Sequence, residues 1–105
     1  MEQRRTRRFT LQLPVTITRS GAERVLHSGL TKNISSGGVL FTSEKEPDLG
    51  GSIEYVITLG APSEPNVNLR CIGKVVRCKR IADSDEPFFD IAATLERYEF
   101  VRPDN

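Results

Sequence analysis

The sequence predicts an all-β domain, built from six short antiparallel strands and folded as a barrel or a sandwich. Apolar and polar residues alternate with a period of two along most of the chain, which is the pattern of a strand that buries one face. Clusters of glycine, proline, serine and aspartate interrupt this pattern at short intervals. With 105 residues, the chain fits one domain, residues 1–105.

The first three strands are expected between residues 11 and 41. In the first, apolar residues alternate from Leu11 to Ile17, and Pro14 predicts an edge position or a bulge because proline lacks an amide hydrogen. The second covers residues 24–34, where Leu26, Leu30 and Ile34 share one parity. A Ser-Ser-Gly-Gly turn at residues 35–38 ends it, and residues 39–41 resume extended structure.

The later strands follow the same rule. Strict alternation from Ile53 to Leu59 predicts the fourth, residues 67–80 predict the fifth with a bend at Gly73, and residues 89–95 predict the sixth. These strands complete a barrel region at residues 11–95. Residues 96–102, before Pro103, are expected to form a short C-terminal helix.

The composition of the chain argues against several classes of function. The chain has 15 lysines and arginines against 14 acidic residues, which argues against a general nucleic-acid-coating protein. No apolar run approaches the roughly 20 residues of a membrane helix, and no secretory signal is visible, so a cytoplasmic protein without membrane insertion is expected. Cys71 and Cys78 are expected as reduced thiols on opposite strand faces. We find no metal-ligand cluster and no catalytic set, so no enzyme is predicted.

Residues 1–10 form an arginine-rich arm that contains Arg4, Arg5, Arg7 and Arg8. Their like charges repel, which favours an extended, flexible arm without a partner. Guanidinium groups bind phosphate bidentately and match the O6 and N7 acceptors of guanine. Taken alone, the cluster is best explained as a solvated basic tail, and non-specific contact to nucleic acid or anionic membranes is a second interpretation.

The segment at residues 33–38 is polar and glycine-rich. Asn33 and Ser35 offer donors and acceptors, and the glycines allow close approach of a ligand. Considered alone, the segment is better explained by ordinary turn chemistry, in which Asn and Ser side chains bond nearby backbone groups.

Together, the arginine-rich arm and the segment at residues 33–38 indicate a function more specifically than either one does alone. Arg4 and Arg8 stand in an R-x-x-x-R arrangement, and Asn33, Ser35 and Gly38 stand in an N-x-S-x-x-G arrangement. This combination resembles the PilZ family of bacterial cyclic di-GMP receptors. Residues 73–77 and 89–98 are similar to the late strands and C-terminal segment of that family, so the resemblance covers nearly the whole chain.

The resemblance implies a six-stranded antiparallel barrel with the arm as a mobile flap. Arg4 and Arg8 would hold guanine and phosphate, and the neighbouring Arg5 would assist them. The domain would bind cyclic di-GMP, order its arm, and pass the signal to a protein partner or an adjoining domain.

The second motif would supply the barrel side of the site. Asn33 would meet a guanine edge, Ser35 would hydrogen-bond the ligand, and Gly38 would keep the turn open. The main alternative is a PilZ-like interaction module that has lost nucleotide binding. A barrel that binds nucleic acid is a third hypothesis. It is disfavoured because such barrels stack bases on aromatic side chains, and the chain has no tryptophan and only two tyrosines.

Overall fold

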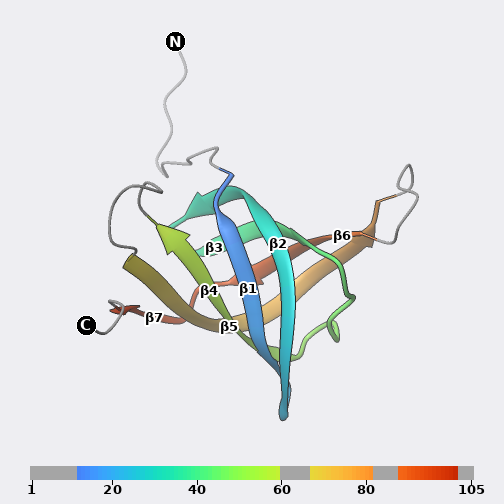
Figure 1. The fold of residues 1–105 in the computed structure, drawn as a ribbon. Coiled ribbons are helices and arrows are strands. Elements are labelled where there is room, and N and C mark those ends of the chain that lie inside the picture. The colour runs from blue at the N-terminus through green and yellow to red at the C-terminus, as the bar shows by residue number, and fades with distance from the viewer. Residues whose placement is uncertain (1–11, 60–66, 82–87, 102–105) are drawn as a thin grey trace.

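A computed structural model describes residues 12–59, 67–81 and 88–101 of the chain (Figure 1). They form one sheet of seven strands. The strands are β1 (Pro14–Ser20), β2 (Glu23–Ser35), β3 (Gly38–Ser43), β4 (Ser52–Leu59), β5 (Val67–Arg80), β6 (Phe89–Thr94) and β7 (Arg97–Val101).

Six of these strands close into a ring. Going round it, β1 pairs with β2, β2 with β3, β3 with β6, β6 with β5, β5 with β4, and β4 with β1. Every pairing is antiparallel. Closure removes the open edges that a flat sheet would expose, which is the physical advantage of a barrel over a sandwich in a short chain. The expected six-stranded antiparallel barrel is therefore confirmed, with one strand added.

The core fills the inside of this ring. The alternation expected in the first and fourth strands is confirmed, because the inward positions of β1 and β4 are buried and their neighbours are not. The buried apolar residues are Val15, Ile17, Val39, Phe41, Ile53, Tyr55, Ile57, Cys71, Val75, Ile91 and Ala93. Each large side chain among them contributes roughly 1.5–3 kcal/mol through removal from water. The rings of Phe41 and Tyr55 stack at its centre, with centroids 5.4 Å apart.

The side chains of β2 do not all face the side of the sheet that the sequence pattern predicts. Leu26 and Leu30 are 76% and 45% exposed, whereas Ile34 packs against the core. The cause is a β-bulge: the register of β2 against β3 shifts by one residue between Thr31 and Asn33. One extra residue reverses the side-chain alternation. Residues that share a parity in the sequence therefore face opposite sides of the sheet.

A second bulge changes the position of the cysteines. The register of β5 against β6 shifts between Val75 and Arg77, so Cys78 packs against the same core that contains Cys71. The expectation of opposite faces was wrong for this reason. Both thiols are free.

The expected C-terminal helix is wrong for residues 97–101, which form β7, and residue 102 lies outside the described part. β7 pairs with the first half of β5, from Arg97 opposite Ile72 to Val101 opposite Asn68. It continues the path of β6 along the same strand after a break at residues 95–96. A two-turn helix is marginal by itself, whereas the edge of β5 offers backbone partners to an extended segment.

No helix in the described ranges is long and apolar enough to cross a membrane.

Candidate functional site

A groove with a volume of about 640 Å³ lies beside the turn between β2 and β3. Residues of four adjacent strands, β2, β3, β6 and β5, line it together with the turn. The lining residues are Asn33, Ser35, Gly37, Gly38, Val39, Leu40, Val76, Arg77, Ala92, Ala93 and Thr94. The structure therefore brings the expected residues Asn33, Ser35 and Gly38 together in one depression.

The bulge in β2 determines where the side chains of Asn33 and Ser35 point. Thr31 is fully buried, and regular alternation would turn Asn33 and Ser35 toward the core as well. The extra residue instead directs Ile34 inward, opposite Val39, and leaves Asn33 and Ser35 partly exposed in the groove. The hydroxyl of Ser35 donates a 3.2 Å hydrogen bond to the carbonyl of Gly38 across the turn.

Gly38 is required by a neighbouring strand. A Cβ at this position would lie 2.8 Å from the carbonyl oxygen of Ala93 in β6, closer than such atoms normally approach. At Gly37 a Cβ would meet nothing within 4 Å. Neither glycine has a positive φ, since Gly21 and Gly50 alone among the described residues have one. Gly38 thus allows the close packing of β3 on β6 that forms the floor of the groove.

The bulge in β5 forms the opposite wall. It places Val76 and Arg77 side by side on the exposed surface, so that Arg77 brings a guanidinium group to the groove. Arg77 forms no ion pair with any other residue that the structure describes. Sequence reasoning missed Arg77; the available signal was the Val-Val-Arg run, which interrupts the alternation of the fifth strand.

Thr94 fixes the end of this wall, and it was also missed. Its hydroxyl accepts a 2.9 Å hydrogen bond from the amide of Lys74 and donates a 3.0 Å bond to Glu96. Its carbonyl accepts a 3.0 Å hydrogen bond from the hydroxyl of Tyr55. The local sequence does not indicate this role, because two of the three partners, Lys74 and Tyr55, lie in β5 and β4.

Arg4, Arg5 and Arg8 lie outside the described residues, so their positions stay a prediction. The structure does place the first residues after the arm. The amide of Leu13 donates a 2.9 Å hydrogen bond to the hydroxyl of Thr31, and its carbonyl accepts a 2.9 Å bond from the amide of Thr31. The chain therefore enters the barrel two residues from Asn33.

The side chains whose pKa values depart clearly from their usual values lie in the core or against it. Burial raises the pKa of Tyr55 far above its usual value, and the nearby Cys71 and Glu96 add to the effect. Burial also raises the pKa of Cys71 to about 12 and, with Glu46, raises that of Cys78. These thiols stay protonated, and protonated thiols are poor nucleophiles.

The groove offers a different chemistry: one amide, two hydroxyls and one guanidinium group. Such groups hydrogen-bond polar edges and attract anions. Among the residues in the described ranges, no cluster of three or more His, Cys, Asp or Glu side chains could hold a metal ion.

The described residues thus form a closed antiparallel barrel with a groove on its outer wall, which carries polar side chains and the guanidinium group of Arg77. Comparison with known families shows the class of domain: the model of the PilZ domain matches residues 2–100. The chain belongs to the PilZ domain family, a family of cyclic di-GMP-binding type.

A solved structure has the same fold. It is the Bacillus subtilis inhibitor of motility, MotI/DgrA, which superposes with a TM-score of 0.59 at 20% sequence identity. The match covers 89% of this chain and 43% of that one, so the chain spans less than half the length of that protein. No curated protein matches the sequence.

Proposed function

We propose that this domain is a cyclic di-GMP receptor that binds the nucleotide between its N-terminal arm and the groove. The observation that carries the proposal is the pairing of Leu13 with Thr31, because this segment follows the arm in the sequence and lies beside the bulge that exposes Asn33. Membership of the PilZ family supports the choice of ligand.

Chain length allows the arm to reach the groove. Arg8 precedes Leu13 by five residues, and an extended chain spans about 3.3–3.6 Å per residue, or roughly 17 Å in total. Thr31 and Leu13 lie on adjacent chain segments, and adjacent strands are about 4.8 Å apart. The guanidinium of Arg8 is therefore within reach of a ligand seated against Asn33, and Arg4 and Arg5 lie farther along the same arm.

Each side of the site would supply complementary groups. Arg4 and Arg8 would hold phosphate and guanine with their planar forks, with Arg5 beside them. The amide of Asn33 would meet a guanine edge, since an amide can both donate and accept hydrogen bonds. Ser35 donates its proton to Gly38, which leaves its oxygen free to accept a hydrogen bond from the ligand.

Arg77 extends the expected site. It lies in the wall opposite Asn33 and Ser35, and it would place a fixed positive charge against the ligand from the barrel itself. Because an exposed guanidinium without an ion-pair partner in the described part has no attraction to give up, a phosphate can engage it at little cost.

Binding would order the arm. Fixing the backbone costs about 1–2 kcal/mol per residue, and charge-assisted hydrogen bonds return about 1.5–3 kcal/mol each. The closed arm would cover the groove and present a new surface to a partner protein or an adjoining domain. The domain would thus act by binding and not by catalysis.

Isothermal titration calorimetry with cyclic di-GMP, against GTP and cyclic GMP as controls, tests the proposal. We expect selective binding by the wild-type chain. Arg8→Ala should weaken it at least about tenfold, equal to 1.4 kcal/mol, with an unchanged melting temperature. Arg24→Ala, at the tip of the β1–β2 hairpin, is the matched control.

Different outcomes contradict different parts of the proposal. Unaltered affinity in Arg8→Ala would remove Arg8 from the site. The absence of heat and of thermal stabilisation in the wild-type chain would reject nucleotide binding and leave a PilZ-like interaction module.

A further inference from the structure

The strand β7 has an open edge. It hydrogen-bonds β5 on one side, and no other strand in the described residues pairs with its second side. All five of its residues are exposed. An unpaired edge presents a row of backbone donors and acceptors to any strand that can align with it.

Two aromatic residues stand on this strand. Tyr98 and Phe100 are 61% and 64% exposed, and their rings meet edge to face with centroids 6.2 Å apart. Their cross-strand partners in β5 are Cys71 and Leu69, so they continue the inner face of the barrel wall beyond the core. Exposed aromatic residues of this kind are enriched at protein interfaces.

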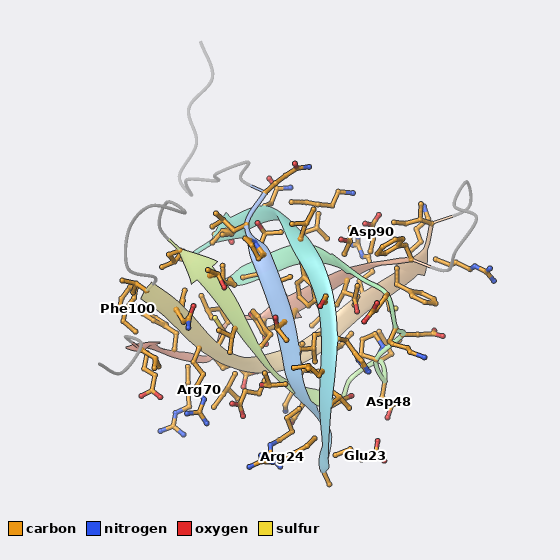
Figure 2. All side chains as sticks on the ribbon, in the orientation of Figure 1. Glu23, Arg24, Asp48, Arg70, Asp90 and Phe100 are labelled. Atoms are coloured by element: carbon orange, nitrogen blue, oxygen red, sulfur yellow. The ribbon has the colours of Figure 1, made fainter. Side chains whose placement is uncertain are left out.

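On the outer face, a row of alternating charges crosses the sheet toward the same edge. Arg19 of β1 lies 3.8 Å from Glu54 of β4, which lies 2.7 Å from Arg70 of β5. Arg70 lies 3.4 Å from Glu99 of β7. The row therefore ends with the carboxylate of Glu99 on β7. Figure 2 labels its cross-strand partner Arg70 and its neighbour in the sequence, Phe100.

Arg97 lies two residues before Glu99, on the same face of the strand. It forms no ion pair with another residue in the described ranges. Two copies of the segment 97–99 are therefore complementary in charge when they align antiparallel. With the two Tyr98 residues opposite each other, Arg97 of each copy faces Glu99 of the other.

We propose that two copies of this chain associate by antiparallel pairing of their β7 strands, about a twofold axis that passes between the two Tyr98 residues. In this register, Arg97 of each copy lies opposite Glu99 of the other. Glu99, at the end of the charge row, then lies opposite Arg97 of the second copy. A symmetric interface of this type uses one patch twice and closes at a dimer.

The charges also select this register. Pairing centred on Glu99 would place two carboxylates directly opposite each other, which is destabilising. Centring on Tyr98 instead brings the tyrosine and Phe100 of both copies onto one face, within the reach of diagonal aromatic contacts. Because only five residues per copy take part, we expect a weak and concentration-dependent dimer.

Sedimentation velocity from micromolar protein to about 1 mM, without nucleotide, tests this inference independently of ligand binding. The wild-type chain should shift from monomer to dimer. Arg97→Glu and Glu99→Arg should each weaken self-association by roughly tenfold or more, because each replaces two attractive pairs with two repulsive ones.

Mixing the two variants gives the decisive measurement. Arg97→Glu in one copy and Glu99→Arg in the other restore both opposite-charge pairs, so the mixture should form a heterodimer that neither variant forms alone. Arg24→Glu makes the same change in charge away from β7 and should associate like the wild type. Unchanged melting curves would show that the variants fold.

A monomeric wild-type chain at every concentration would overturn the proposal and leave the edge to another protein. Unaltered association of Arg97→Glu, or a mixture without heterodimer, would overturn the register.

Discussion

The hydroxyl of Tyr55 donates a 3.0 Å hydrogen bond to the carbonyl oxygen of Thr94. Tyr55 is fully buried and stacks on Phe41, whereas Thr94 lines the groove at the end of β6. The bond joins the centre of the core to the wall of the candidate site. It crosses from β4 to β6, which do not pair with each other in the sheet.

Tyr55→Phe should lower the free energy of unfolding by about 1–2 kcal/mol, because the ring stays in place and the hydrogen bond is lost. Urea denaturation measures this change. Tyr98→Phe removes a hydroxyl from an exposed ring and should leave stability unaltered. Equal effects of the two substitutions would contradict the structural role of the bond.

Gly38→Ala should destabilise the barrel by about 1–3 kcal/mol, since its methyl group would press against the carbonyl of Ala93. Separation of β3 from β6 should also weaken ligand binding. Gly37→Ala is the adjacent control, where space is open and φ is not positive. Thermal denaturation of both variants, with and without cyclic di-GMP, measures the two effects. A stable Gly38→Ala domain would argue against the close packing described here.

The alternation of β2 predicts opposite outcomes for two neighbours. Val25 packs against the core, so Val25→Ala should reduce stability by about 1 kcal/mol. Leu26 points outward, and Leu26→Ala should change it by no more than about 0.5 kcal/mol. Chemical denaturation of the pair checks the facing of the strand. The reverse order would restore the parity expected from the sequence.

Stability should fall at alkaline pH. The thiol of Cys71 loses its proton near pH 9.0 in the unfolded chain, but burial raises its pKa to about 12 in the folded protein. Above pH 9 the unfolded state therefore binds fewer protons, and the free energy of unfolding decreases as pH rises toward 12. The raised pKa values of Tyr55 and Cys78 act in the same direction.

Denaturation curves between pH 7.5 and pH 10.5, on either side of the thiol pKa of 9.0 in the unfolded chain, measure this loss. Cys71→Val removes the thiol, and its curve should decline less steeply with pH than that of the wild type. Identical slopes would show that Cys71 does not contribute.

Local patterns predict most of this fold. Alternation and turn signals together located all six barrel strands, although the parity expected for β2 was wrong. They succeed because a half-buried strand reflects its environment in its own sequence. Two features depend on neighbouring strands, and the local sequence does not indicate them. The bulge after Thr31 arises from the register against β3, and β7 exists because β5 has an edge available to residues 97–101.

The site divides in the same way. Asn33, Ser35 and Gly38 form a local motif, and the structure brings all three to one groove. Arg77 and Thr94 join them from distant parts of the chain, through the pairing of β6 with β3 and β5. Only the topology makes these five residues neighbours, so a linear motif could identify just the first three.

The ring of six strands closes without β7. Detaching residues 97–101 from β5 would break their pairing and the ion pair between Arg70 and Glu99, and would leave the barrel seam between β5 and β6 intact. Backbone amides of this segment should consequently exchange with deuterated solvent through a small, local opening, at far lower cost than those of the barrel. We therefore expect β7 to open as a separate cooperative unit, which a partner could capture while the barrel stays folded.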